Sequence, residues 1–251
     1  MDLLDKLSRG YSSILVFDCE FWHVLNNGEN VKNVNKSDFF FLPREIGGVL
    51  ITKNKKWKLN NFFVTLDSPS KDMAFPASHF DTVGKTTKNK LLELEKQLEL
   101  PWGESFYSEL TPEGKKVFKD GVQLYTNDSN IKKHHKPLSW ISKFMKVYSN
   151  SLVIVKGTSD IDALKNLCSI RKYTYLEPAS LIDISNWNSE SHKLCGSAKL
   201  EDTFHCIKPK VSSHIKELMH LLPLGEAHNP SSDAAMTLVV VLYILENKNT
   251  Y

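Results

Sequence analysis

The stretch Ser13-Ile14-Leu15-Val16-Phe17-Asp18-Cys19-Glu20-Phe21 predicts the central strand of this chain. Ile14 to Phe17 are apolar and β-prone, as in a strand that is buried on both faces. Because residues two apart on a strand point to the same face, the carboxylates of Asp18 and Glu20 share one small volume. Like charges that close repel each other unless a cation lies between them. We therefore expect a divalent-metal site at the end of this strand; the alternative is a strand that ends in two solvated acids.

A second acidic position follows another short apolar run. Leu152 to Val155 has the composition of a buried strand, and the polar turn after it leads into a segment with apolar residues at helical spacing. Asp160 stands in the first turn of that predicted helix, whereas Asp162 faces elsewhere. An acid in this place is also an ordinary helix-capping residue, which is favourable by ~1 kcal/mol. Asp160 alone does not decide between these roles.

A third acidic position lies near the C-terminal end of the sequence, before a long apolar run. Pro230 and Ser231 predict the start of a helix, with Ser231 or Ser232 as its N-cap. Asp233 then lies in the first turn, and His228 lies in the loop just before it. His-x-x-x-x-Asp is a common pattern, and an acid in the first turn also complements the helix dipole. The order of the three positions along the chain is more specific than any one of them.

That order resembles the DEDDh family of 3′→5′ exonucleases. The family has Asp-x-Glu on its first strand, an Asp that opens a helix after a later strand, and His-x-x-x-x-Asp at its last helix. Its second strand commonly begins with Glu-Ile-Gly, which here is Glu45-Ile46-Gly47. The matching residues of this chain are Asp18, Glu20, Asp160, His228 and Asp233.

The pattern of elements and the resemblance predict the same fold class. It is an α/β fold of the ribonuclease-H-like type, with a mixed five-stranded sheet (three antiparallel strands, then parallel strands) flanked by helices. We expect a single domain over residues 1–251, with a mostly helical inserted segment at about 67–137. The expected strands are 12–19, 45–53, 57–66, 152–156 and 173–184, and the expected helices are 138–148, 160–170, 197–207 and 231–246.

The resemblance implies a metal-dependent exonuclease that releases nucleoside 5′-monophosphates from the 3′ end of RNA or single-stranded DNA. Two Mg²⁺ or Mn²⁺ ions would be held by the four acids and would act in a two-metal mechanism. His228 would take a proton from the attacking water. The resemblance places substrate contacts at Cys19, Phe21, Trp22 and His23, and core packing is the alternative for the two aromatic residues.

The chain departs from the family pattern at four places. Lys156 stands where the family has Asn, Ser159 where it has Phe, and Pro230 where it has Ala. Phe21-Trp22-His23 follow the first Glu, where the family often has small hydroxyl residues. These changes alter the expected nucleotide pocket but remove neither an acid nor His228. Two other function classes compete with the enzyme: an inactive RNA- or DNA-binding module of the same fold, and a subunit that docks a protein partner through the insertion. Because inactive relatives tend to lose carboxylates, the complete set of acids favours the enzyme.

A second group of residues supplies the nitrogen and sulfur ligands that zinc prefers. Some relatives of the DEDDh family carry a structural zinc in this region. The spacing here is not that of a standard finger, and adjacent residues on a helix point in different directions, so the alternative is that the cysteines are ordinary core residues. The four candidate zinc ligands are His192, Cys195, His205 and Cys206.

Composition limits the remaining choices. The chain has 251 residues, 41% of them hydrophobic, which supports a folded core. It contains no apolar stretch long enough to span a bilayer and no signal-peptide pattern, so we expect an intracellular protein, in cytoplasm or nucleus, without membrane contact. In that compartment the four cysteines are expected to be reduced.

The net charge of +3 does not by itself indicate a nucleic-acid partner, but the positive charge is unevenly placed. Basic residues crowd the second half of the insertion, which also contains Phe118 and Tyr125, so phosphate contact and base stacking are both available there. The alternative is a solvated surface segment. The basic residues are Lys115, Lys116, Lys119, Lys132, Lys133, His134, His135 and Lys136.

Overall fold

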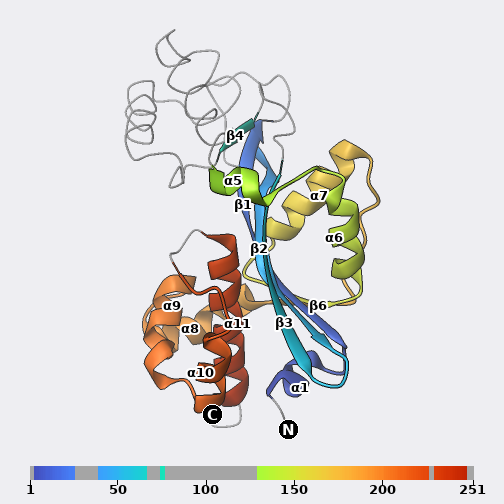
Figure 1. Ribbon diagram of the computed structural model, residues 1–251. Coiled ribbons are helices and arrows are strands. Elements are labelled where there is room, and N and C mark those ends of the chain that lie inside the picture. Colours follow the sequence, from blue (N-terminus) through green and yellow to red (C-terminus); the bar gives the residue numbers. More distant parts are fainter. Residues whose placement is uncertain (1–2, 26–38, 67–73, 77–128, 226–228, 248–251) are drawn as a thin grey trace, which may run out of the picture.

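The computed structural model describes residues 3–25, 39–66, 74–76, 129–225 and 229–247 (Figure 1). Most of the predicted insertion therefore lies outside the described residues. Its C-terminal part is described from Ser129 onward and joins the sheet.

Within the described residues, seven strands form one mixed sheet. They are β1 (Ser13–Leu25), β2 (Phe39–Lys53), β3 (Trp57–Leu66), β4 (Ala74–Pro76), β5 (His135–Lys136), β6 (Leu152–Val155) and β7 (Ser180–Asp183). The strand order is β5-β3-β2-β1-β6-β7, and β4 pairs with the end of β1. β1 and β3 are antiparallel to β2, whereas β6 is parallel to β1 and to β7. The predicted five-stranded ribonuclease-H-like sheet is confirmed, with two short strands added at its margins.

The strand boundaries differ from the expected ones where pairing extends or limits them. β3 has the expected bounds, but β1 and β2 continue beyond theirs as a long antiparallel ribbon that runs to the pair Leu25 and Phe39. β7 is much shorter than expected, because β6 offers it only four residues to pair with. β4 and β5 have two or three residues each, too few to show a periodic pattern.

Helices cover both faces of the sheet (Figure 1). The four expected helices are confirmed, and α1, α5, α8 and α10 are additional. None of the described helices has the length and hydropathy needed to span a membrane. One face carries α6 (Trp140–Ser149) and α7 (Ser159–Arg171); the other carries α1 (Leu3–Ser8), α8 (Asn188–Cys195), α9 (Leu200–Ile207), α10 (Ser213–Met219) and α11 (Pro230–Asn247); α5 (Ser129–His134) lies near the edge strand β3.

Alternation along β1 divides the interior into two hydrophobic cores. Leu15 and Phe17 pack in the core that faces α6 and α7, whereas Val16 packs in the core that faces α11. Asp18 and Glu20 continue the series of Val16, so they lie on the face of the sheet that α11 covers. The period of this one strand therefore decides which helix can bring a further acid to them.

Candidate metal centre

The first two acids of the site lie on β1, an interior strand of the sheet. Glu20 is only 7% exposed, and Asp18 is half-buried. A β-bulge follows at once: Glu20 is opposite Glu45 on β2, but Phe21 is opposite Pro43, so that Arg44 is the extra residue. A bulge bends its strand and re-aims the neighbouring side chains, and such bulges are frequent beside active sites.

α11 brings Asp233 to these acids because its first turn lies directly on the sheet. A Cβ atom at Gly47 would be 2.2 Å from the backbone nitrogen of Ser231, so a residue with a side chain would hold the helix further out. The Ser231 hydroxyl donates a hydrogen bond to the Phe62 carbonyl at 2.8 Å. Helix and sheet are thus fixed to each other two residues before Asp233.

The helix start differs from the expected one by one residue. Asn229, and not Ser231 or Ser232, is the capping residue: its side-chain oxygen accepts hydrogen bonds from the backbone N–H groups of Ser231 at 3.1 Å and Ser232 at 3.3 Å. Pro230 is then the first helical residue, where its missing N–H costs nothing. The two serines are consequently free for other contacts, such as that from Ser231 to β3.

α7 supplies the fourth acid in another way. Asp160 lies in the first turn of this helix and is 4% exposed. One of its carboxylate oxygens accepts a hydrogen bond from the backbone N–H of Cys19 at 2.9 Å. This bond ties the start of α7 to the point on β1 between Asp18 and Glu20. Asp162, two residues further along the helix, is exposed and faces elsewhere, as expected.

Three of the acids form a compact cluster. Asp18, Glu20 and Asp233 each offer a carboxylate oxygen, and these oxygens all lie within 4.8 Å of one another. Burial, followed by the charges of Asp160, Asp233 and Glu20, raises the pKa of Asp18 well above its ordinary value. Asp18 therefore keeps its proton to a higher pH than an ordinary Asp unless another positive charge replaces the proton.

Asp160 is part of the same electrostatic system, although its oxygens are not among the three. Burial is the main cause that raises its pKa to about 8, and the nearby charge of Glu20 adds to it. The hydrogen bonds from the backbone N–H groups of Cys19 and of Asp160 itself act in the opposite direction. Asp160 is thus placed to orient β1 and to add negative charge beside the cluster.

This donor set fits a hard divalent cation. Carboxylate oxygens are the ligands that Mg²⁺ and Mn²⁺ prefer, and a cation among Asp18, Glu20 and Asp233 would offset the repulsion between these carboxylates. No sulfur or imidazole belongs to the cluster within the part of the chain that the structure describes. The residues present therefore match the metals expected from the sequence.

The other expected site residues occupy varied positions. The Cys19 thiol is buried in the core that faces α6 and α7, away from the acids, and burial raises its pKa; only its backbone N–H reaches Asp160. Phe21 is half-buried and packs against the same core. Trp22 and His23 belong to β1, but their side chains are outside the described residues, as is His228.

Arg44 and Glu45 were not expected to belong to the site. Arg44 is 2% exposed, and one of its terminal nitrogens lies 3.3 Å from a carboxylate oxygen of Glu45. Glu45 is the direct cross-strand partner of Glu20, so this ion pair compensates a further buried acid beside the cluster. The signal was present in the sequence: two charged residues in an otherwise apolar strand are as unusual here as Asp18 and Glu20 are on β1.

Lys156, which stands at the position where the family pattern has Asn, is bound by two groups outside the acidic cluster. Its ammonium group donates hydrogen bonds to the side chain of Asn188 at 3.2 Å and to the Ala198 carbonyl at 2.8 Å. Burial lowers its pKa, and the charge of Asp183 opposes this effect. Lys156 thus links the end of β6 to α8 and to the segment between α8 and α9.

Two of the four cysteines are not reduced as expected, and the candidate zinc ligands form no metal-binding group among the described residues. Cys195 and Cys206 form a disulfide between α8 and α9, with their Cα atoms 5.8 Å apart, so they offer no thiolates to a metal. His192 and His205 are exposed and do not join them in a metal-binding group among the described residues. Cys19 and Cys168 remain free and buried. The disulfide was not expected, because an intracellular protein was predicted and its thiols would be reduced. The separation of 11 residues along the chain gave no sign of the disulfide either.

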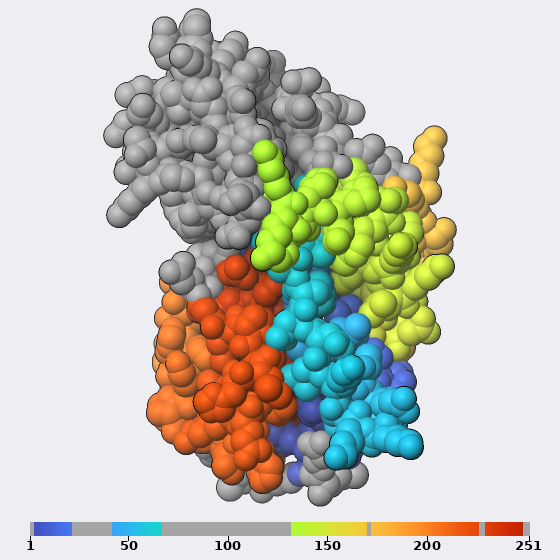
Figure 2. Space-filling model, viewed as in Figure 1, coloured from blue at the N-terminus to red at the C-terminus, as the bar shows by residue number. Residues whose placement is uncertain are grey.

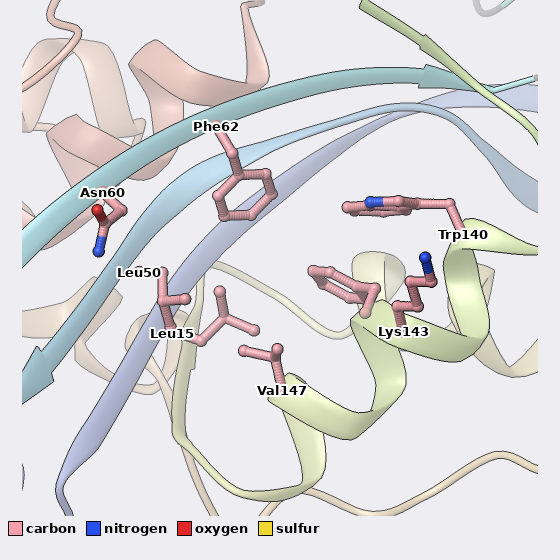
Figure 3. Close-up of a pocket in the computed structure, with 8 residues that line it drawn as sticks. Leu15, Leu50, Asn60, Phe62, Trp140, Lys143 and Val147 are labelled. Carbon is pink, nitrogen blue, oxygen red and sulfur yellow. The ribbon is translucent and has the colours of Figure 1, made fainter.

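An apolar groove of about 220 Å³ lies between the sheet and α6 (Figure 3). Leu15, Phe62, Trp140 and Val147 are among the residues that line it. Because Leu15 is on the face of β1 opposite to Asp18, the groove lies on the other side of the sheet from the acids. It is not part of the metal centre.

The sequence matches no family model and no curated protein. Solved structures that are similar to the chain include a product-bound exonuclease I (TM-score 0.44, 10% identity, covering 95% of this chain and 44% of that one). Another is a 3′-exonuclease that recognises a histone mRNA stem-loop (TM-score 0.41, 12% identity, covering 95% of this chain and 65% of that one). A third is the nuclease domain of 3′hExo, a DEDDh family member, bound to rAMP (TM-score 0.39, 10% identity, covering 95% of this chain and 94% of that one). The chain thus spans less than half of the exonuclease I chain. These likenesses are distant.

Proposed function

We propose that this protein is a metal-dependent 3′→5′ exonuclease that hydrolyses RNA or single-stranded DNA to nucleoside 5′-monophosphates. One observation carries the proposal: Asp18, Glu20 and Asp233 bring three carboxylate oxygens within 4.8 Å of one another from two distant parts of the sequence. Buried like charges are costly, so a cluster of this kind indicates a bound cation. The motif order that resembles the DEDDh family supports phosphodiester hydrolysis as the reaction.

Each acid has a distinct part in the proposed site. Asp18, Glu20 and Asp233 would hold the ions, and Asp18 would be shared by both. Asp160 would orient β1 through the Cys19 N–H and supply charge to the second ion. When bound, two divalent ions about 3.5–4 Å apart stabilise the attacking and leaving oxygens of an in-line displacement.

The general base in this proposal is His228, which precedes the first residue of α11 by two positions. A neutral imidazole accepts a proton near neutral pH, so its place in the His-x-x-x-x-Asp pattern suits a group that deprotonates water. The requirement for a free 3′ end follows from the family resemblance.

A hydrolysis assay tests this function. Purified protein is incubated with Mn²⁺ and 5′-labelled single-stranded RNA or DNA, and we expect a ladder of products that shortens from the 3′ end. Asp18→Asn should abolish the reaction, whereas Asp162→Asn, an exposed acid that is not in the cluster, should leave it unchanged.

Two results would contradict the proposal. Cleavage of a circular single strand at a similar rate would indicate an endonuclease. A wild-type protein that binds the labelled strand and leaves it intact with both Mg²⁺ and Mn²⁺ would instead be a binding module of the same fold. A 3′-phosphate on the linear substrate provides an internal check, since it should slow digestion by a 3′-end-dependent enzyme.

A further inference from the structure

One row of residues crosses the sheet from the metal centre to the inserted strand β5. Glu20 on β1 is paired with Glu45 on β2, Glu45 with Thr65 on β3, and Thr65 with His135 on β5. Three steps between neighbouring strands amount to about 14 Å. The insertion, whose sequence carries the crowded positive charge, therefore returns to the sheet at the level of the acids.

Two contacts connect the same two regions on the side of the sheet that carries the acids. The Ser231 hydroxyl, in the first turn of α11, donates to the Phe62 carbonyl at 2.8 Å. The ring of the next residue, Phe63, lies edge-on to His134 at the end of α5, with the ring centroids 5.3 Å apart. Adjacent residues of β3 thus contact both the helix that carries Asp233 and the helix that carries the basic residues. Figure 1 shows α5 near the N-terminal end of α11, and in Figure 2 the green surface of the segment that begins with α5 lies beside the red surface of α11; α5 contacts β3, with which β5 pairs.

The basic strip is the segment Lys132-Lys133-His134-His135-Lys136. Its three lysines and His135 are exposed, and His134 is half-buried against Phe63. The sequence from Ser129 to Ser149 contains five lysines and no Asp or Glu, so no acid of this segment neutralises the strip. The strip is therefore a local concentration of positive charge close to the acids, which an anionic chain that reaches the acids would also meet.

We propose that the basic strip binds the phosphate backbone of a single-stranded nucleic acid a few nucleotides upstream of the 3′ end held at the acids. This inference rests on the function proposed above and adds the path of the substrate to it. The negative charge of a phosphate backbone is opposite to that of the strip. Lysines that bind phosphates also release the counterions held by the nucleic acid. At a rise of about 3.4 Å per stacked nucleotide, 14 Å corresponds to about four nucleotides, so a dinucleotide reaches the acids and not the strip.

The chain offers a matched pair of charge reversals. Lys132→Glu/Lys133→Glu changes the strip, and Lys55→Glu/Lys56→Glu makes the same change in the exposed turn between β2 and β3. That turn connects Lys53, the last residue of β2, with Trp57, the first residue of β3. Lys53 is eight residues along β2 from Glu45, a distance of about 27 Å at the usual rise per residue. All four side chains are exposed, so both variants should fold, as equal thermal unfolding midpoints would show.

Binding of a fluorescein-labelled single-stranded decamer is measured in EDTA as a function of salt, and hydrolysis of the decamer and of a dinucleotide is measured in Mn²⁺. We expect Lys132→Glu/Lys133→Glu to weaken decamer binding on the order of tenfold and to flatten the slope of log K against log salt by about 1.4, which is two lost contacts at ~0.7 each. The kcat/KM for the decamer should fall in proportion, and that for the dinucleotide should not change. The turn variant should match the wild type in every measurement.

The outcomes distinguish the proposed role of the basic strip from the proposed enzymatic function. Equal losses in the two charge-reversal variants, no loss in either, or a lost dinucleotide reaction in the strip variant would overturn the role of the strip. Displacement of the decamer by poly-glutamate of equal charge, as effective as displacement by unlabelled decamer, would also overturn it, in favour of an acidic protein partner. A wild type that hydrolyses neither substrate but shows the expected binding difference would overturn the proposed function and leave the strip as a nucleic-acid site.

Discussion

A Cβ atom on Gly47 would lie within 2.2 Å of the backbone nitrogen of Ser231. Gly47 is the cross-strand partner of Asp18, and Ser231 precedes Asp233 by two residues in the first turn of α11. The absence of a side chain at this one position therefore lets the helix lie on the sheet closely enough for Asp233 to join Asp18 and Glu20.

Gly47→Ala should accordingly damage the metal centre more than the fold. The added methyl group must displace the start of α11 or bend β2, and overpacking of this kind typically costs ~1–3 kcal/mol of stability. We expect hydrolysis and the stabilisation of the protein by Mn²⁺ to be lost while the protein still unfolds cooperatively. Gly225→Ala is the control, since a Cβ atom there meets nothing within 4 Å. Full activity in Gly47→Ala would show that Asp233 does not need this contact.

The positions of the acids within the strands and helices could be predicted because each follows a short-range rule. Asp18 and Glu20 follow from the period of a strand, and Asp160 and Asp233 from their positions in the first turns of helices. The Asn229 cap was missed because Ser231 and Ser232 satisfy the same local rule, and only the contact from Ser231 to β3 excludes them.

Features that depend on distant partners were harder to predict. The bulge at Arg44 exists only in the register of β1 against β2, and β5 is a strand only because β3 offers it an edge. The disulfide between Cys195 and Cys206 depends on how α8 packs on α9, whereas the count of cysteines indicated only a compartment. Local patterns thus predicted the acids and the main elements, and tertiary packing decided the details around them.

Two acids in the first turn of α7 test the role of charge beside the cluster. Asp160→Asn keeps the shape of the side chain but removes a buried charge next to Asp18 and Glu20. By analogy with residues that support metal ligands, the affinity for Mn²⁺ should fall about 10–100-fold. Asp162→Asn, two residues away and exposed, should bind Mn²⁺ as the wild type does. Isothermal titration of the metal-free proteins gives both values, and equal affinities would remove Asp160 from the site.

The metal-free protein should lose stability as the pH rises. The pKa of Asp160 is raised to about 8 and that of Asp18 is raised as well, so between pH ~4 and 8 the folded state binds more protons than the unfolded state, and the free energy of unfolding falls with increasing pH. Urea unfolding in EDTA at pH 5 and pH 8 measures this difference, and Asp160→Asn should reduce it. With Mn²⁺ present the trend should weaken or reverse, since the cation binds the ionised acids. A metal-free protein that is more stable at pH 8 than at pH 5 would contradict the buried cluster.

His228→Ala tests the proposed base. Because the ring would act on the attacking water, kcat should fall about 10²–10⁴-fold while the affinity for the decamer changes little. The pH–rate profile should also lose its limb near neutrality. His214→Ala is a suitable control, as His214 is exposed on α10. An unchanged rate and pH profile in His228→Ala would leave the chemistry to the acids and their metals, or to another group such as His23.

The ion pair between Arg44 and Glu45 makes the last prediction. Arg44 is 2% and Glu45 3% exposed, so removing the guanidinium in Arg44→Met leaves a buried carboxylate beside Glu20 without its compensating charge. Loss of one partner of a buried pair typically costs ~3–5 kcal/mol, whereas replacing both partners by neutral groups costs far less. Arg44→Met should therefore be strongly destabilised in urea unfolding at pH 7, and Arg44→Met/Glu45→Gln should recover at least half of the loss.

The same double-mutant cycle distinguishes charge from packing. Arg44 also fills space in the bulge, and lost packing would destabilise the single and the double variant equally. The exposed pair between His205 and Glu201 on α9 is the control, since its atoms are 3.9 Å apart at the surface and Glu201→Gln should change stability by less than ~1 kcal/mol. If Arg44→Met and the double variant unfold at the same urea concentration, the guanidinium contributes bulk and not charge, and the compensation of Glu45 must come from elsewhere in the site.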